Sequence, residues 1–285
     1  MTSHSQSAAR GPKPRAADFM GGVYLQIGFD NDGGVILEYQ EKNAEIIDGW
    51  VREDGMWGDV TSHEAFLRAK DGDWAVMLTP EKTVPRDWFP DLTGKDVLGL
   101  AAGGAEQMPI FAACGARCAV LDYSEAQLHR EREVAAREGY EINIVRADMS
   151  KALPFPDASF DLIFHPVSNH FVEDVPSVWR ECSRVLRPGG VLLAGFENGL
   201  NLAFDEEETR PVYRLPFNPL KDPALYEDSI QNGWGIEFSH TVEELIGGQL
   251  RAGFALTDIY SATNEAGNFR DHNIPTFYAT RVVKR

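Results

Sequence analysis

A run of small residues, GLAAGGA at 99–105, overlaps the end of the apolar stretch Asp96–Leu100. Small side chains let the backbone approach a ligand closely, and the first turn of a following helix offers unpaired N–H groups. The pattern therefore predicts a ligand-binding turn between a strand and a helix. The alternative is a tight turn that only packs the helix against its sheet.

Two acidic residues follow the next two apolar stretches. Asp122 stands roughly 20 residues after Gly103, a spacing at which a carboxylate can accept hydrogen bonds from both hydroxyls of a ribose. Asp148 precedes Met149, so a carboxylate for an adenine amino group stands beside an apolar side chain for the adenine ring. The alternatives are that Asp122 is a solvated loop residue and that Asp148 caps the next turn.

Two histidines, His165 and His170, stand where a general base would be useful, at and just after the end of a fourth apolar stretch. Imidazole titrates near neutral pH, so His170 is the first candidate for a base and His165 the second. The alternative is that both only form hydrogen bonds in the pocket. Glu197 and Asn198 end a fifth stretch, where they could orient a polar acceptor or cap the loop.

Alternating strands and helices must position these residues. The predicted strands lie at 95–100, 116–121, 141–146, 160–165 and 191–196, and the predicted helices at 105–114, 124–138 and 175–186. This alternation predicts an α/β protein with a doubly wound, mostly parallel sheet, in which ligands gather at the carboxyl ends of the strands. A helix opened by the capping box of Thr241 and Glu244 precedes two last strands, at 254–262 and 276–283, predicted to form an antiparallel pair.

The remaining parts of the chain lack this alternation. Residues 1–18 are polar and predict a flexible tail, and 19–92 predict an N-terminal helical cap segment with a helix at 35–50. The main domain is predicted at 93–285, with 197–240 as a lid-like insertion because that segment is long, irregular and rich in aromatic residues. These aromatic residues and the tryptophans of the cap segment indicate an apolar substrate pocket or, alternatively, the core of the cap.

The composition limits the classes of partner. The chain has 285 residues, with 27 Lys and Arg against 44 Asp and Glu and a net charge of −17, which argues against nucleic acid as a partner. Its three cysteines have neither framework nor metal-site spacing, so we expect a reducing compartment and no metal. No run approaches the ~20 apolar residues of a membrane span, and no signal peptide is evident. We therefore expect a cytoplasmic protein without a membrane partner, and a homodimer stays open.

Four segments resemble a known family: VLGLAAGGA (97–105), AVLDYS (119–124), RADMSKALPFPDASFDLIF (146–164) and RVLRPGGVLLAGF (184–196). They are similar to the class I S-adenosylmethionine-dependent methyltransferases, in the branch with the ubiquinone and menaquinone biosynthesis enzymes and the type 11 methyltransferase domain. The phrases LPFPDASFDLIF and VLRPGG are more specific than the glycine pattern. The resemblance covers about a third of the chain. It implies a Rossmann-like fold and S-adenosylmethionine as the cofactor.

The resemblance also implies roles for individual residues. The turn at 99–104 would hold the methionine part of the cofactor, with His165 beside it and near the transferred methyl group. Asp122 would bind the ribose hydroxyls, Tyr123 would flank the adenine, and the pair after the third strand would hold the adenine edge and face. The implied cofactor-binding residues are Gly99, Leu100, Ala101, Gly103, Asp122, Tyr123, Asp148, Met149 and His165.

The turn departs from the pattern of the family. An acid and three glycines are usual, but here those positions hold Gly99, Ala101, Gly103 and Ala105. With alanine at these positions, the backbone is expected to approach the cofactor closely only at negative φ. The missing acid leaves the amino group of the cofactor without its expected partner, and Glu106 or an N-terminal residue could replace it.

These features together predict an S-adenosylmethionine-dependent methyltransferase that acts on a small organic acceptor by in-line methyl transfer. A non-catalytic sensor of S-adenosylmethionine or S-adenosylhomocysteine is the alternative that the altered turn keeps open. An NAD(P)-dependent oxidoreductase fits less well, because the turn lacks the G-x-G-x-x-G spacing.

Overall fold

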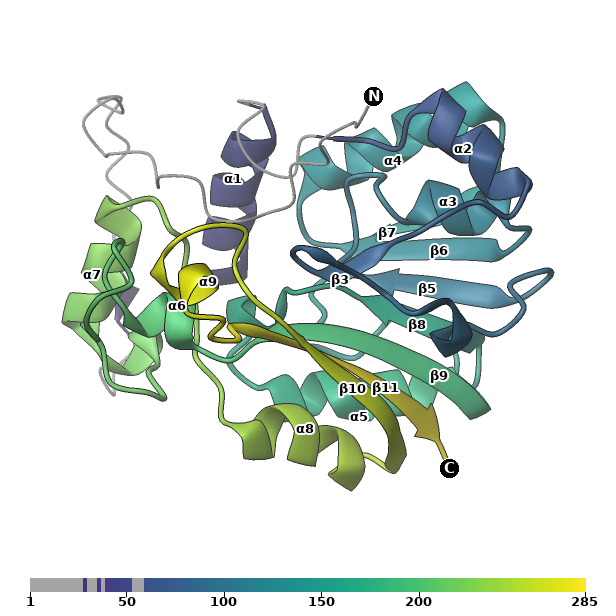
Figure 1. Ribbon diagram of the computed structural model, residues 1–285. Coiled ribbons are helices and arrows are strands. Elements are labelled where there is room, and N and C mark those ends of the chain that lie inside the picture. The colour runs from purple at the N-terminus through teal and green to yellow at the C-terminus, as the bar shows by residue number, and fades with distance from the viewer. Residues whose placement is uncertain (1–27, 30–34, 37–38, 53–58) are drawn as a thin grey trace.

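One central sheet organises the protein, which is described here from a computed structural model of residues 28–29, 35–36, 39–52 and 59–285. Its strands are β5 (Asp96–Leu100), β6 (Arg117–Asp122), β7 (Ile142–Arg146), β8 (Phe160–His165), β9 (Leu186–Glu197), β10 (Phe254–Ala262) and β11 (Phe277–Lys284). Their spatial order is β7-β6-β5-β8-β9-β11-β10 (Figure 1). The strands from β7 to β9 pair in parallel, and β11 is antiparallel to both of its neighbours. The predicted mostly parallel sheet with an antiparallel C-terminal pair is confirmed.

Helices cover both faces of this sheet. The helices are α1 (Tyr39–Arg52), α2 (His63–Lys70), α3 (Met108–Ala113), α4 (Glu125–Glu138), α5 (Val175–Val185), α6 (Leu200–Ala203), α7 (Pro223–Gln231), α8 (Val242–Arg251) and α9 (Asn268–Asp271). In Figure 1, α2, α3 and α4 lie above the sheet and α5 and α8 lie below it, whereas α1, α6, α7 and α9 gather beyond the carboxyl ends of the parallel strands. Two small hairpins complete the described part: β1 (Gly28–Phe29) with β2 (Val35–Ile36), and β3 (Met77–Thr79) with β4 (Lys82–Thr83).

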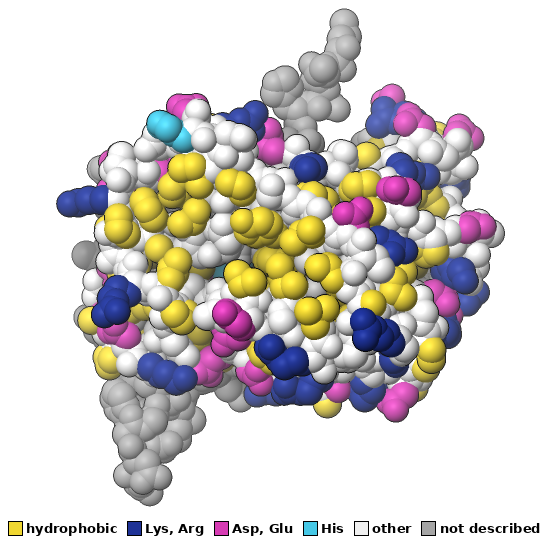
Figure 2. Space-filling view, turned by 60° about the horizontal axis from the view of Figure 1, so that its bottom comes forward, with side chains coloured by type: hydrophobic (Ala, Val, Ile, Leu, Met, Phe, Trp, Pro, Cys, Tyr) yellow, Lys and Arg dark blue, Asp and Glu magenta, His cyan; other side chains and the backbone are white. Residues whose placement is uncertain are grey.

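Side-chain alternation along the strands builds a core on each face. Leu98, Ile163 and Leu192 pack toward the α5 and α8 side. Val97 and Phe164, one residue away on the same strands, pack toward the α2 and α3 side. Figure 2 shows the lower side, where α8 lies, with hydrophobic side chains gathered across its middle and charged ones mostly toward the margin. No described helix is long and apolar enough to cross a membrane.

Several predicted boundaries shift for local reasons. The helix predicted at 35–50 begins at Tyr39, because Val35–Ile36 pairs with Gly28–Phe29 as a strand. The turn predicted around RPGG lies inside β9, where Leu186 and Val191 pair with residues only two apart on β8 and the residues between them bulge out. The capping box of Thr241 and Glu244 is confirmed.

The segment predicted as an N-terminal cap contributes to the main core. Leu78 and Trp88 are each 2% exposed and belong to the cluster beneath α3. The division of the chain at residue 92 stays a prediction, and the predicted tail at 1–18 lies outside the described residues.

Helix α1 is attached to the predicted insertion. The side-chain amide of Asn43 donates to the carbonyl of Ile236 (2.9 Å) and accepts from its N–H (2.7 Å). Tyr39 packs edge-on against Phe238, with ring centroids 5.2 Å apart. Residues 197–240 also contain α6 and α7, so the segment is less irregular than predicted. Its role as a lid stays a prediction.

Candidate functional site

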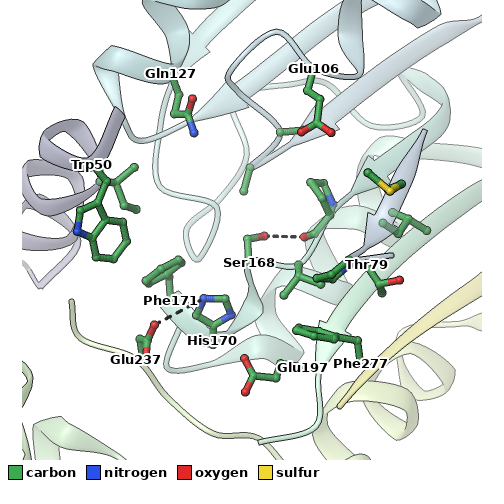
Figure 3. Close-up of a pocket in the computed structure, with 18 of the residues that line it drawn as sticks. Trp50, Thr79, Glu106, Gln127, Ser168, His170, Phe171, Glu197, Glu237 and Phe277 are labelled. Carbon is green, nitrogen blue, oxygen red and sulfur yellow. Dashed lines mark hydrogen bonds and ion pairs between the residues drawn. The ribbon is translucent and has the colours of Figure 1, made fainter. Parts of the chain in front are cut away.

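A cavity of about 1690 Å³ lies at the carboxyl ends of the parallel strands. It reaches from the small-residue turn after β5 to α1, to the loop after β8 and to the insertion (Figure 3). Ligand pockets commonly hold about 300–1,000 Å³, so this space is large enough for a cofactor and a second small molecule. The sequence-based prediction that a ligand site forms at this edge of the sheet agrees with the position of the cavity.

The small-residue turn adopts a left-handed backbone at two alanines. Ala101 has φ 48° and Ala105 has φ 57°, so the expectation that alanine keeps a negative φ here is wrong. Each such residue costs on the order of 1–2 kcal/mol. Hydrogen bonds from two backbone N–H groups hold the strained turn: Ala101 N donates to the carbonyl of Leu121 (2.8 Å), and Ala105 N donates to the carboxyl group of Glu131 (2.7 Å).

Gly99 and Leu100 lie beneath the cavity rather than on its wall. A Cβ at Gly99 would stand 2.5 Å from Sδ of Met108, so this glycine allows α3 to pack against β5. Leu100 is fully buried. Both residues thus have a packing role, and their predicted contact with the cofactor stays a prediction. Ala101 and Gly103 do line the cavity.

Asp122 joins the turn to the end of β6. Its Oδ2 accepts from Gly103 N (3.0 Å) and its Oδ1 accepts from Ser124 N (3.0 Å). A Cβ at Gly103 would stand 2.9 Å from Oδ2 of Asp122, so only glycine fits there. Burial raises the pKa of Asp122, although the backbone hydrogen bonds oppose this shift. Each carboxylate oxygen keeps acceptor capacity toward the cavity that Asp122 lines. Its role toward a ribose stays a prediction.

Helix α1 clamps the loop after β6. The hydroxyl of Tyr123 donates to Glu41 (2.5 Å), and Arg146 lies over the Tyr123 ring while its guanidinium donates to the same Glu41 (3.0 Å). Asp48 accepts from the hydroxyl of Ser124 (2.5 Å). Tyr123 lines the cavity, and Glu41 of α1 and Arg146 of β7 hold its side chain in place. Glu41 and Asp48 gave no sequence signal, because they stand far upstream on a helix with many charges.

Asp148 and Met149 both line the cavity where β7 ends. Oδ1 of Asp148 accepts from Ser150 N (2.8 Å), so the capping alternative is observed. Met149 is 8% exposed and also belongs to the core below. The placement leaves both residues available to an adenine, and that role stays a prediction.

The two histidines occupy different environments. His165 is fully buried, its Nδ1 donates to the carbonyl of Leu100 (2.8 Å), and its Nε2 lies 3.0 Å from the side-chain oxygen of Asn169. Burial lowers the pKa of His165, and the ring does not line the cavity. This setting favours the alternative that His165 only forms hydrogen bonds, and its roles toward the substrate proton and the cofactor stay predictions.

His170 does line the cavity. Its Nε2 lies 4.0 Å from Oε1 of Glu237, and both side chains are 13% exposed (Figure 3). Sequence patterns did not indicate Glu237, which comes from the loop before α8. The pair brings an imidazole ring and a carboxylate close together in the wall of the cavity.

Two acids with raised pKa values lie beside the turn. Glu106, the suggested substitute for the missing acid, lines the cavity, and burial raises its pKa. Glu131 on α4 is completely buried, and burial raises its pKa to about 8. Sequence reasoning did not single out Glu131, because a charged helix normally presents its acids to solvent.

The other end of the cavity holds a different set of side chains. Glu197 ends β9 and lines the cavity, together with the rings of Trp50, Phe171 and Phe277 (Figure 3). Asn198 instead caps the loop, since its side chain accepts from Leu200 N (3.1 Å) and donates to a carbonyl. No group of three or more potential metal ligands occurs among the described residues.

Some tryptophans and other aromatic residues belong to the core, and others line the cavity. Trp88 donates from its ring to Asp258 (2.8 Å) within the core. Trp234 and Tyr213 of the insertion line the cavity. Trp57 lies outside the described residues.

Known proteins are similar to this chain in sequence. Residues 98–194 match a family profile described as "Methyltransferase domain". An "Uncharacterized methyltransferase YbaJ" of Bacillus subtilis is 40% identical over 249 residues, which are 85% of this chain and 97% of that protein. The "Ubiquinone/menaquinone biosynthesis C-methyltransferase UbiE" of Paracoccus denitrificans is 35% identical over 116 residues, 39% of this chain and 46% of that protein.

The fold has a counterpart among solved structures. An S-adenosylmethionine-dependent methyltransferase from Mesorhizobium loti aligns with a TM-score of 0.55 at 24% identity, covering 70% of this chain and 95% of that one. The Bacillus methyltransferase is similar to this chain over 97% of its own length. The order of the strands in the sheet is consistent with the same family. The chain therefore belongs to the class I S-adenosylmethionine-dependent methyltransferases.

Proposed function

We propose that this methyltransferase transfers a methyl group to a small organic acceptor enclosed in the cavity. The observation that carries the proposal is the continuity of that cavity: one space is lined by Gly103 and Asp122 at one end and by His170 and Glu197 at the other. One continuous cavity can hold both reactants close together, and proximity is a main protein contribution to methyl transfer.

The cofactor end offers groups that suit S-adenosylmethionine. Asp122 and Asp148 offer carboxylate acceptors, and Oε1 of the 7% exposed Gln127 is buried in the cavity wall without a hydrogen-bond partner among the described residues. These acceptors match the hydroxyl and amino donors of the cofactor. When bound, its sulfonium supplies an activated methyl group.

His170 is the proposed general base. It lies in the acceptor half of the cavity, with Oε1 of Glu237 4.0 Å from its Nε2. It would take a proton from an acceptor whose nucleophilic atom must lose one, while Ser168, also in the cavity wall, would help to orient that atom.

A methyl-transfer assay tests the proposal. The full chain is incubated with S-adenosylmethionine that carries a radiolabelled methyl group and with separate pools of small alcohols, phenols, amines and carboxylic acids, each also supplied with protein and RNA as possible acceptors. The expected result is label in the low-mass fraction of at least one pool. Label found only on added protein or RNA would contradict the proposal.

The sensor alternative is favoured by one observation, the glycine that replaces the usual acid at position 99. It predicts calorimetric binding of S-adenosylhomocysteine with no label transferred to any pool. The same calorimetry with NADH is expected to show no binding.

A further inference from the structure

We propose that His240 is a positioning residue, whose buried ring fixes the loop that carries His170. This inference rests on the proposed function, in which His170 is the general base, and adds a residue that acts on it from outside the cavity. His240 is not among the residues that line the cavity, and its side chain is 6% exposed. Its ring can therefore affect methyl transfer only through the residues that it contacts.

The contact that carries the inference joins the His240 ring to the peptide group before His170. Nε2 of His240 lies 3.1 Å from the carbonyl oxygen of Asn169. A carbonyl oxygen only accepts, so Nε2 carries a proton and donates it. The same oxygen accepts from Val172 N (3.0 Å), the bond that closes the short turn in which His170 lies. The ring of His240 therefore binds the turn at the point where it closes.

A second hydrogen bond from the same segment holds the next peptide group. The N–H of Phe238 donates to the carbonyl of His170 (2.6 Å). Phe238 is 2% exposed and packs against Tyr39 of α1, so this donor is itself fixed in place. Two successive carbonyl groups, those of Asn169 and His170, are thus bound by residues two apart in the segment before α8. Together these bonds set the orientation of the backbone that carries the His170 ring.

The segment that supplies both donors is anchored at each end. Ile236 bonds to the side chain of Asn43 through its N–H and its carbonyl. Thr241 opens α8 with its capping box, in which the Glu244 side chain accepts from Thr241 N (2.8 Å). The segment also carries Glu237, which lies beside the His170 ring (Figure 3). It can therefore serve as a fixed support for that ring.

The core holds the same turn through another part of Asn169. Its side-chain oxygen lies 3.0 Å from Nε2 of His165, and its side-chain nitrogen donates to the carbonyl of Gly195 (3.5 Å). The core thus holds the Asn169 side chain, and His240 holds the Asn169 backbone. Because a small displacement of a reacting group lowers the rate strongly, loss of the His240 contact should affect methyl transfer more than cofactor binding.

The tautomer of His240 gives a test on the unchanged protein. Long-range ¹H–¹⁵N correlation spectra of the full chain with ¹⁵N-labelled histidine distinguish a proton on Nε2 from one on Nδ1. The spectrum of His240→Gln identifies the His240 signals by their absence. We expect a His240 ring with a proton on Nε2. A neutral ring that carries its proton on Nδ1 would overturn the inference.

Two substitutions separate the hydrogen bond from the presence of a polar side chain. Gln places an amide nitrogen as many bonds from Cβ as Nε2 is in histidine, whereas the amide nitrogen of Asn lies nearer to Cβ. His240→Gln should therefore keep the donor to Asn169, and His240→Asn should lose it. His129→Asn, on the exposed face of α4, where the histidine side chain is 67% exposed, is the matched control.

Hydrogen exchange measured by mass spectrometry on the full chain reports on the loop directly. In His240→Asn, exchange in the peptide that spans 166–172 should become about tenfold faster, while a peptide from β5 keeps its rate. His240→Gln and the control should stay within about twofold of the unchanged protein. No change at 166–172 in His240→Asn, or an equal rise in all peptides, would overturn the inference.

The rate of methyl transfer provides a readout that loss of stability alone would not give. With the acceptor pool that takes up label and saturating S-adenosylmethionine, His240→Asn should lower the rate about tenfold, and His240→Gln should restore most of it. Affinity for S-adenosylhomocysteine should change by less than about twofold in both. Equal losses of rate in the two variants would overturn the inference. Failure of the proposed function would show separately, as no label in any pool, whereas the tautomer and the exchange rates test the support of the loop in either case.

Discussion

The two ends of the cavity are built in different ways. At the cofactor end, Asp122 is fixed by backbone N–H groups of the turn and of its own loop, within segments that directly follow β5 and β6. At the acceptor end, His170, Glu197 and Glu237 come from three separate segments that the insertion brings together. We infer that the central sheet and its turns form the proposed cofactor site, whereas the insertion, which is outside the regular strand–helix alternation, forms the proposed acceptor site.

Loss of the proposed base should have the largest effect. It should lower activity at the acceptor end and leave ligand binding at the cofactor end unchanged. His170→Ala is expected to lower kcat by about 10²–10⁴-fold, because general-base assistance is lost. Affinity for S-adenosylhomocysteine should stay unchanged. His165→Asn serves as a comparison, since it removes a buried ring and should lower stability instead. An undiminished kcat in His170→Ala would show that the ring has no proton-transfer role.

The buried Glu131 makes the stability of the cofactor end dependent on pH. Its pKa is about 8 in the folded protein against 4.5 for the ordinary group. Between these values the unfolded chain is ionised while the folded chain keeps the proton. Stability therefore falls as pH rises through this window, by at most about 1.4 kcal/mol per pH unit.

Glu131→Gln removes this titration and keeps an acceptor for Ala105 N. The free energy of unfolding of the variant relative to the unchanged protein should rise between about pH 5 and pH 8 and then level off. Denaturant unfolding at several pH values measures it. A difference that stays flat across the window would contradict the buried protonated state.

The strained turn should give the smallest effect. Ala101→Gly and Ala105→Gly each remove the cost of a positive φ in the folded protein, and each also adds conformational entropy to the unfolded chain. Because the first effect is the larger one, each variant is expected to raise the free energy of unfolding by up to about 1 kcal/mol. Ala102→Gly, at a position without positive φ, should lower it. Equal losses in all three variants would show that the turn is not strained.

Local patterns predict the cofactor end well. The apolar runs predict the strands, and the spacing from Gly103 predicts the position of Asp122. This works because neighbouring parallel strands end at the same edge of the sheet. The backbone of Ala101 and Ala105 could not be predicted, since contacts with Leu121 and Glu131 hold it.

The acceptor end was less predictable. Side-chain alternation puts His165 on the same side of β8 as Ile163, so its ring points into the core and packs near Trp179 of α5 (5.9 Å between centroids). The position of His165 at the end of a strand did not by itself indicate this. Glu237 stands in a loop without periodic sequence. A hydrogen bond from Phe238 N to the carbonyl of His170 (2.6 Å) holds this loop beside His170.

Calorimetric titration with S-adenosylhomocysteine tests the division of the cavity most directly. Asp122→Ala is expected to weaken binding by roughly 1–3 kcal/mol, because it leaves buried donors unpaired. Glu197→Gln, at the other end, should change the affinity by less than about twofold, and Asp71→Ala, in an exposed loop, controls for loss of charge. Unchanged affinity in Asp122→Ala, or an equal loss in Glu197→Gln, would contradict the assignment of the two ends.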